Sequence, residues 1–342
     1  MSSASRAAAA QRQSRCSCPK SCRLSILQVV PPHGTHMDFL CLRPMTKTQT
    51  HSPVVTSFFD RATNTVTHVV SDPATKSAAI IDSVMDYDPA AGQISYKSAD
   101  TVAEHIRAEG LSVEWILETH VHADHLSAAP YLQAKLGGKL GIGKKIIDVQ
   151  NIFGKVFNAG TEFARDGSQF DALWEEGDRF VVGTIPARVL YTPGHTPADV
   201  SYVIGDAVFV GDTLFMPDYG SARCDFPGGS AEELYDSVQK IFALPDETRM
   251  FLCHDYLPEG RTEYAWETSV GEQKHANIHL RLGTDESSFI AKRTERDQKL
   301  GMPKLIIPSL QVNMRAGNLP TSEDNGTTYL KVPVNGIFAK KP

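Results

Sequence analysis

The sequence has no long apolar run, little cysteine beyond its first fifty residues and no excess of basic residues. None of the hydrophobic stretches approaches the roughly 18 residues that a membrane-spanning helix needs, so we expect no membrane partner. The formal net charge of the 342 residues is −6. A general nucleic-acid binder usually carries a basic balance or stripe, so we expect no nucleic-acid partner either.

The six cysteines are unevenly placed, because only Cys224 and Cys253 lie beyond the first fifty residues. A disulfide scaffold would spread its cysteines through the fold, so the main body is expected to be a reduced, intracellular protein. The apolar content of 41% is typical of a soluble globular protein with a sizeable core. Cys16, Cys18 and Cys22 lie in a stretch without periodicity, and we favour a reading in which they bind no metal.

Residues 1–50 form an arm of different composition, rich in Ser, Ala, Arg and Gln. Asp38 is its only acid against seven lysines or arginines. Such an arm resembles an organellar transit peptide, which would direct the protein to the mitochondrion instead of the cytoplasm. An over-long start is the alternative, since Met37 and Met45 both precede the expected folded part. We therefore expect one catalytic domain over residues 51–342, with a C-terminal extension from about residue 257.

The folded part alternates strand-like and helix-like segments, which predicts an α/β protein. Helical spacing ends at about residue 300, and the four prolines at positions 303, 308, 320 and 333 predict an extended segment after it. A polar link is expected at residues 87–89. The expected strands are 54–59, 65–70, 78–82, 113–117, 140–142, 179–182, 187–192, 201–204, 207–210 and 250–253, and the expected helices are 99–109, 128–136, 231–242, 267–282 and 287–300.

A cluster of metal-ligand residues follows the apolar strand 113–117. It contains His120, His122, Asp124 and His125, and imidazole nitrogens together with carboxylate oxygens are what a divalent cation binds. On a regular strand His125 would face away from the other three, so we expect a loop that turns them inward. A histidine-rich turn without a metal is the alternative reading.

Three more candidate ligands also follow apolar strands. His195 lies on a Thr-Pro-Gly-His turn, Asp212 follows Phe209-Val210-Gly211, and His254 follows Phe251-Leu252-Cys253. A lone histidine in a turn is more often solvated than ligating, but an aspartate at the end of a buried strand would be costly to leave unpaired. Open sheets commonly place their sites at strand ends, so the repetition predicts a shared site.

Over roughly residues 54–260 the sequence resembles the metallo-β-lactamase superfamily. The resemblance is carried by four motifs, in this order: His-x-His-x-Asp-His, Thr-Pro-Gly-His-Thr, Gly-Asp-Thr-Leu-Phe and Cys-His-Asp-Tyr. The resemblance implies a four-layer αβ/βα sandwich with metal at the edge between two sheets. It also implies two possible metal sets. In the zinc set, the first Zn(II) ion would be held by His120, His122 and His195. A second ion, if present, would be held by Asp124, His125 and His254, with Asp212 bridging the two. A single Fe(II) would use His120, His195 and Asp212 alone.

The segments Arg223-Cys224-Asp225-Phe226 and His254-Asp255-Tyr256 are similar to the persulfide dioxygenase family. That resemblance implies an Fe(II) enzyme, with Arg223, Asp225, Phe226 and Tyr256 around glutathione persulfide and O2 as the second substrate. Arg223 could hold a carboxylate bidentately, while Asp225 could instead pair with Arg223 and Phe226 could be core. The alternative is a zinc metallohydrolase of the glyoxalase II kind acting on a thioester or lactone. For the assembly of the protein, a homodimer is the expectation.

Because every motif lies after residue 50, a chain that starts at Met45 should keep the full activity. Comparison of kcat and KM between this chain and the full-length protein tests the expectation. A large loss of activity would instead give the arm a role in folding or catalysis.

Overall fold

The computed structural model describes residues 52–336, which lie within one compact unit, Gln49–Pro342. Two six-stranded sheets and a three-stranded sheet make up its β-structure. The arm at residues 1–50, with its transit-peptide reading and its cysteine cluster, lies outside the described residues. Within them, no helix is long and apolar enough to cross a bilayer.

The first sheet contains the strand that leads to the histidine cluster. Its β1, β2 and β3 form an antiparallel meander, and β3, β6, β8 and β9 run parallel. The order is β1 (Val54–Asp60), β2 (Thr65–Ser71), β3 (Ser77–Ile81), β6 (Ser112–Leu117), β8 (Lys139–Gly143) and β9 (Ala172–Trp174).

The second sheet delivers the three later candidate ligands at its strand ends. All its neighbours are antiparallel except β13 and β14, which are parallel. The order is β10 (Arg179–Val182), β11 (Ile185–Tyr191), β12 (Val200–Ile204), β13 (Ala207–Phe209), β14 (Arg249–Phe251) and β15 (Glu267–Ser269).

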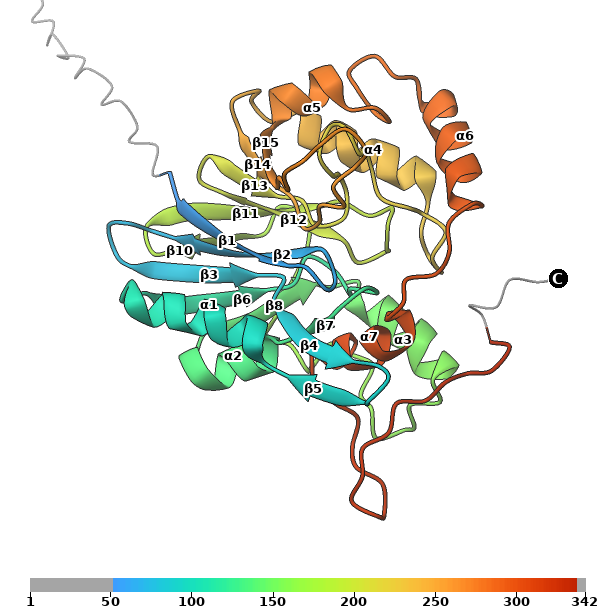
Figure 1. The fold of residues 1–342 in the computed structure, drawn as a ribbon. Coiled ribbons are helices and arrows are strands. Elements are labelled where there is room, and N and C mark those ends of the chain that lie inside the picture. The colour runs from blue at the N-terminus through green and yellow to red at the C-terminus, as the bar shows by residue number, and fades with distance from the viewer. Residues whose placement is uncertain (1–51, 337–342) are drawn as a thin grey trace, which may run out of the picture. The chain divides into compact units, whose positions relative to one another are not determined.

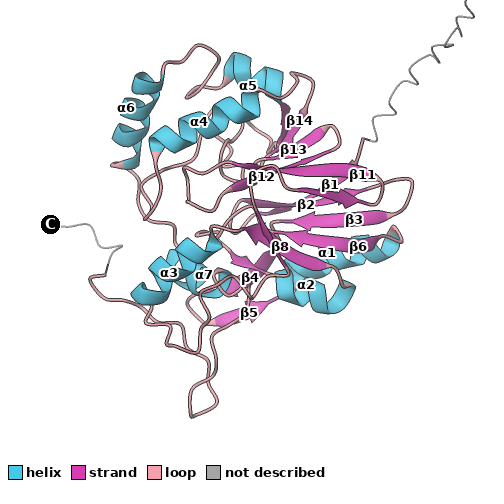
Figure 2. Ribbon diagram, turned by 180° about the vertical axis from the view of Figure 1, so that it is seen from behind, coloured by secondary structure: helices cyan, strands magenta, loops and turns pink. Residues whose placement is uncertain are grey.

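Helices cover the outer faces of both sheets, as Figures 1 and 2 show. On the first sheet lie α1 (Lys97–Ala108), α2 (Ala129–Leu136) and α3 (Ile146–Val156). On the second lie α4 (Ala231–Phe242) and α5 (Val270–Ala276), and α6 (Glu286–Asp297) packs against α4. α7 (Ile306–Asn313) lies beside α3. The small sheet has the order β5 (Gln93–Ser95), β4 (Val84–Asp88) and β7 (Leu126–Ser127).

Three separate hydrophobic clusters define the four layers. The alternation along β3 shows how, because Ile80 packs toward α1–α3 whereas Ile81 packs into the core between the two sheets. Successive side chains of a strand point to opposite faces, so a fully buried strand feeds two cores at once. A third cluster, with Leu234 and Val238 of α4, fills the space outside the second sheet. The expected αβ/βα sandwich is therefore confirmed.

The region after residue 257 corrects two predictions. The expected helix 267–282 begins with strand β15, because Ser269 caps the helix by accepting a hydrogen bond from the Glu272 N–H at 3.1 Å. The expected extended segment contains α7 with Pro308 inside it. That proline is tolerated because the first N–H groups of a helix have no intrahelical partner.

A third prediction, the polar link at residues 87–89, is also wrong, since Tyr87 and Asp88 belong to β4.

Candidate metal centre

The histidine cluster lies in a loop between β6 and β7, as the spacing predicted. His120, His122 and His125 are almost completely buried there, whereas Asp124 is partly exposed. The loop turns histidines that are two and three positions apart in sequence toward one region, with ring centroids 4.1 Å apart for His120 and His122 and 4.2 Å apart for His122 and His125.

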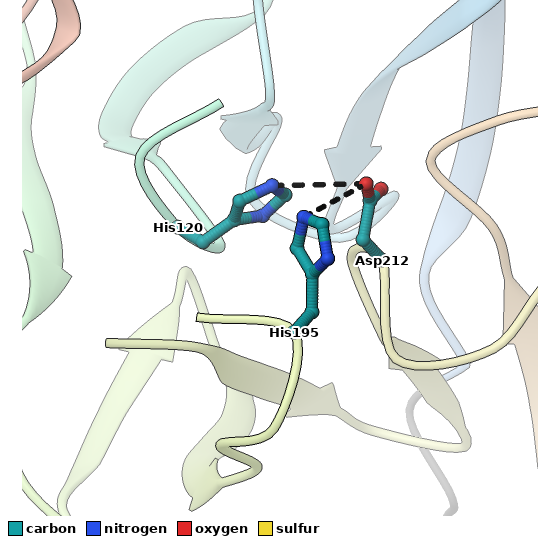
Figure 3. Close-up of side chains that lie close together, drawn as sticks. All are labelled: His120, His195 and Asp212. Atoms are coloured by element: carbon teal, nitrogen blue, oxygen red, sulfur yellow. Dashed lines mark ion pairs between the residues drawn. The ribbon is translucent and has the colours of Figure 1, made fainter. Parts of the chain in front are cut away.

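His120, His195 and Asp212 come together from three different strand ends (Figure 3). The Nε2 atoms of His120 and His195 lie 3.8 and 3.5 Å from Asp212 Oδ2. His120 follows β6 of the first sheet, while His195 and Asp212 follow β11 and β13 of the second. The three ligands proposed for Fe(II) therefore form one compact group.

The other four candidates lie next to this group. His254 Nε2 is 3.2 Å from Asp212 Oδ1 and 3.4 Å from Asp124 Oδ2, and His125 Nδ1 is 3.3 Å from Asp124 Oδ2. His122, Asp124 and His125 form a second set of atoms close enough to hold an ion. All seven predicted positions are thus brought together, which leaves both one-metal and two-metal occupancy open.

Hydrogen bonds decide which ring nitrogen of each histidine can bind a metal. His195 Nδ1 lies 2.8 Å from the Arg223 carbonyl and His254 Nδ1 lies 3.0 Å from the Asn64 carbonyl. A carbonyl oxygen only accepts, so Nδ1 carries the proton in both rings and Nε2 keeps its lone pair. Both Nε2 atoms face the Asp212 carboxylate, so their lone pairs point to the position where a metal bound by Asp212 would lie.

The same rule applies to His120 and His122. His122 Nε2 lies 3.0 Å from Asp82 Oδ1 and 3.3 Å from Glu118 Oε2, which leaves Nδ1 bare. Thr119 Oγ1 donates to Asp82 Oδ2, so it accepts from His120 Nδ1 at 3.0 Å and leaves His120 Nε2 bare. These acceptors orient the rings in the way that outer hydrogen bonds orient metal ligands.

The unpaired atoms test whether a metal fits. His120 Nε2, His122 Nδ1 and His125 Nε2 are buried without any hydrogen-bond partner. A buried polar atom left without a partner costs about 1–3 kcal/mol. A divalent ion would satisfy several of them together, and neutral imidazole nitrogens with a carboxylate are a donor set for zinc or iron. The residues present therefore fit a metal ion.

Electrostatics favour neutral His120 and ionised Asp212. Burial and the neighbouring His122 lower the pKa of His120 well below its usual value. Burial alone would raise the pKa of Asp212, but His254, His120 and His195 outweigh it and lower that pKa. Burial would likewise lower the pKa of His122, whereas Asp82 and Glu118 raise it well above the usual value, so a metal that binds Nδ1 would displace a proton from it.

Asp82, Glu118 and Thr119 are residues that the sequence analysis missed as part of the site. Asp82 directly follows β3, which is the same strand-end signal that identified Asp212, so it could have been found. Glu118 lies between the buried Leu117 and the histidine cluster, where an acid is unusual. Its Oε1 accepts a hydrogen bond from Ser127 at 2.6 Å, and its Oε2 faces His122.

Asn313 at the end of α7 was also missed, and nothing in the sequence indicates its role. Its side-chain amide donates to the carbonyls of His122 and His125 at 2.9 and 2.8 Å, and its Oδ1 accepts from the Ser127 N–H at 2.8 Å. Asn313 is buried and lies 186 to 191 residues away from these partners in sequence. The C-terminal segment therefore holds the backbone of the histidine loop.

A cavity of about 880 Å³ opens onto the cluster, and Asp124, His195 and Asp212 line it. Of the four predicted substrate residues, Arg223, Phe226 and Tyr256 also line the cavity. Asp225 is absent from the lining and pairs with Arg223 instead.

The Arg223 guanidinium is already occupied by protein groups. Its Nε and one terminal nitrogen donate to the two carboxylate oxygens of Asp225 at 2.6 and 2.7 Å, and the other terminal nitrogen donates to the Gly301 carbonyl at 2.6 Å. Its carbon lies 4.8 Å from the centre of the Phe226 ring. Arg223 thus fastens the segment around Gly301, and the pairing with Asp225 that the sequence left open is present.

Cys224 and Cys253, the free cysteines of the described residues, are not placed to act as nucleophiles, although Cys253 lies close enough to Asp212 and His254 to share a metal ion with them. Burial raises the pKa values of Cys224 and Cys253, so neither is a ready thiolate. Burial lowers the pKa of His68 to about 4, and this ring lies 3.0 Å from the Leu252 carbonyl. His68 is buried, and both of its ring nitrogens have partners, Ser57 Oγ and the Leu252 carbonyl.

Gly194 allows the turn that carries His195 to approach α4. Its φ is +141°, and a Cβ there would lie 2.4 Å from the backbone nitrogen of Leu234. Gly194→Ala should lower the free energy of unfolding by about 1–3 kcal/mol, because the helix backbone would have to move. Gly177→Ala is the control, since Gly177 also has a positive φ but open space around its Cβ position. Equal losses in chemical denaturation would show that the close approach is unimportant.

Asn313→Ala should weaken metal binding as well as stability, because it leaves two carbonyls of the histidine loop unpaired. We expect roughly a tenfold loss of metal affinity, the lower end of the effect of outer contacts at metal sites. Competition with a chelator measures the affinity, and Asn318→Ala, which removes an exposed bond to the Arg315 carbonyl, is the control. Unchanged affinity in the Asn313 variant would limit that residue to a structural role.

Comparisons with known proteins agree with this geometry. The model of the metallo-β-lactamase superfamily matches residues 45–254. A probable metallo-hydrolase of Burkholderia pseudomallei is 51% identical over 294 residues, which cover 83% of this chain and 99% of the relative. A beta-lactamase hydrolase-like protein of Agrobacterium fabrum is 53% identical over 283 residues, and the chain spans 65% of its length.

Two further relatives carry the name ETHE1. The mitochondrial persulfide dioxygenase ETHE1 of Homo sapiens is 29% identical over 262 residues, covering 76% of this chain and 87% of the relative. The crystal structure of ETHE1 from Myxococcus xanthus has a TM-score of 0.61 and 30% identity, covering 78% of this chain and 100% of that one. From its fold, its motifs and these matches, the chain belongs to the metallo-β-lactamase superfamily.

Proposed function

We propose that the chain is a mononuclear Fe(II) persulfide dioxygenase, which oxidises glutathione persulfide with O2 to sulfite and glutathione. The observation that carries the proposal is the compact group of His120, His195 and Asp212. Two histidines and one carboxylate on one face are typical of non-haem iron oxygenases, because they leave positions open for oxygen and substrate. The similarity to ETHE1 from two organisms supports the same reading.

The reaction consumes one persulfide, one O2 and one water and yields one thiol, one sulfite and two protons. The terminal sulfur is oxidised and O2 is reduced, while the sulfur–sulfur bond breaks and the thiol leaves with a proton. Bound by His120, His195 and Asp212, Fe(II) would supply the redox chemistry that O2 requires. The lone pairs on His120 Nε2 and His195 Nε2 are held in place for this by Thr119 and by the Arg223 carbonyl.

Aromatic side chains shape the cavity beside the cluster. The Tyr256 ring is stacked on His254, with centroids 5.5 Å apart, and Tyr219 and Phe215 lie 5.0 and 5.8 Å from Tyr256. These rings line the cavity together with Asp212, and Phe215 and Tyr256 pack against the His254 ring, so they exclude water from that side of His254. A drier site strengthens the electrostatic contacts between a sulfur anion and the metal site.

A zinc-dependent hydrolase is the second candidate, and one observation favours it. His122 and His125 each have a bare, buried nitrogen, and with Asp124 they form a second group of potential ligands. Two zinc ions shared among the seven ligand positions would suit hydrolysis of a thioester or lactone, with water activated at the metal. The name of the Burkholderia pseudomallei relative, a probable metallo-hydrolase, points the same way.

Asp212→Ala should remove iron and activity together. We expect the rate to fall by more than the roughly 10–100-fold typical of outer contacts at metal sites, because Asp212 is a direct ligand in the proposal. Elemental analysis gives iron per chain, and an oxygen electrode gives consumption after addition of glutathione persulfide. Asp236→Ala, an exposed acid on α4, is the control.

Two results would contradict the proposal. Full iron occupancy in the Asp212 variant would remove this residue from the ligand set. An iron-loaded wild-type protein that consumed no O2 but hydrolysed a glutathione thioester would favour the hydrolase instead.

A further inference from the structure

The part of the cavity wall formed by α6 and the residues that follow it is positively charged. Arg293, Arg296 and Lys304 line the cavity there, and this stretch of the wall contributes no acidic side chain. The wall around β4 and β5 is different, because Asp86 and Asp88 line it together with Lys97. The cavity therefore has one strictly cationic side.

Two of the cavity's arginines already have partners within the protein. Arg293 donates to Asp297 at 2.6 Å and to the Ser221 carbonyl at 2.9 Å. Arg223 holds Asp225 and the Gly301 carbonyl, as described above. Their guanidinium groups fix the wall, and a substrate carboxylate would have to displace a protein carboxylate to use them.

Arg296 and Lys304 are different, because their side chains make no hydrogen bond or ion pair with residues 52–336. The contact of Arg296 is with the ring of Tyr219, whose centroid lies 5.8 Å from the guanidinium carbon. Arg296 is half-buried and Lys304 is exposed. Two cations that line a cavity without a counter-charge are available to an anionic ligand.

A series of ring contacts connects Arg296 with the metal cluster. His254 contacts Tyr256, Tyr256 contacts Tyr219 at a centroid distance of 5.0 Å, and Tyr219 contacts Arg296. These contacts form a continuous wall between the cluster and Arg296, and an extended peptide ligand can lie along it.

We propose that Arg296 and Lys304 bind a carboxylate of the substrate at the end of the cavity away from the metal cluster. The preferred substrate is then a thiol or persulfide of small-peptide size with a carboxylate remote from its sulfur. Arg296 offers a planar fork for two carboxylate oxygens, and Lys304 adds a mobile point charge. This inference rests on the proposed function for the identity of the reacting sulfur, and it moves carboxylate recognition from Arg223 to Arg296.

Ligand binding tests the inference without any turnover. Glutathione and glutathione diethyl ester are titrated into the full-length, metal-loaded protein by calorimetry. Arg296→Gln with Lys304→Gln should weaken binding of glutathione about tenfold or more, as expected when charged hydrogen bonds are lost. The same change should leave the weaker binding of the diester unaltered, because the ester carries no carboxylate.

Two further variants separate the contact from general effects. Arg281→Gln removes the same charge from an exposed side chain outside the cavity and should bind glutathione like the wild type. Arg296→Lys keeps the charge but loses the fork, so it should recover part of the affinity. An equal loss for glutathione and its diester, or wild-type affinity in the double variant, would overturn the subsite.

Kinetics then distinguish this inference from the proposed function. In oxygen-consumption assays the double variant should raise the KM for glutathione persulfide about tenfold and change kcat by less than about twofold. Oxygen uptake with an unchanged KM would discard the subsite and keep the dioxygenase. Suppose instead that the double variant binds glutathione less tightly but the diester unchanged, and that the wild type takes up no oxygen. That result would keep the subsite and discard the dioxygenase.

Discussion

The candidate site depends on hydrogen bonds to the outer nitrogen of its histidine rings. The carbonyls of Arg223 and Asn64 fix the protons of His195 and His254, and Asp82 with Glu118 fixes that of His122. Each ring then presents a lone pair toward one small region. Without these acceptors an imidazole could rotate or change tautomer. The ring nitrogens would then no longer present their lone pairs to a common metal position.

The four-layer sandwich brings those rings together from distant parts of the chain. His120 leaves the first sheet after β6, whereas His195, Asp212 and His254 leave the second sheet after β11, β13 and β14. Side chains from both sheets fill the core between them, which fixes their separation. Because this core is close-packed, the distance between the two halves of the site is fixed as firmly as the fold itself.

The segment after Tyr256 completes the site in a way that the superfamily motifs do not encode. α6 and the residues around Gly301 form the cationic wall of the cavity, and Arg223 and Arg293 attach that wall to the protein. α7 then packs beside α3 and places Asn313 against the histidine loop. The cationic wall of the cavity and the geometry of the histidine loop therefore both depend on the C-terminal segment.

Much of this could be predicted from local sequence. Alternating and continuous apolar runs gave most of the strands, and Ala231–Phe242 was predicted with the bounds that α4 has. The strand-end positions of His120, His195, Asp212 and His254 are also visible in the sequence, because an apolar run that stops at a polar ligand is a local pattern. Short strands such as β5, β7 and β9 were missed, since two or three residues carry too little periodicity to detect.

The sequence by itself determined which residue types could bind a metal and that each follows a buried strand. Only the tertiary structure decided which nitrogen of each ring is bare, that Arg223 is engaged by Asp225, and that Arg296 and Lys304 lack partners. The physical reason is that proton position and charge pairing depend on contacts between residues far apart in the chain. Asn313 and His122 show this most clearly, because they are 191 positions apart and joined by one hydrogen bond.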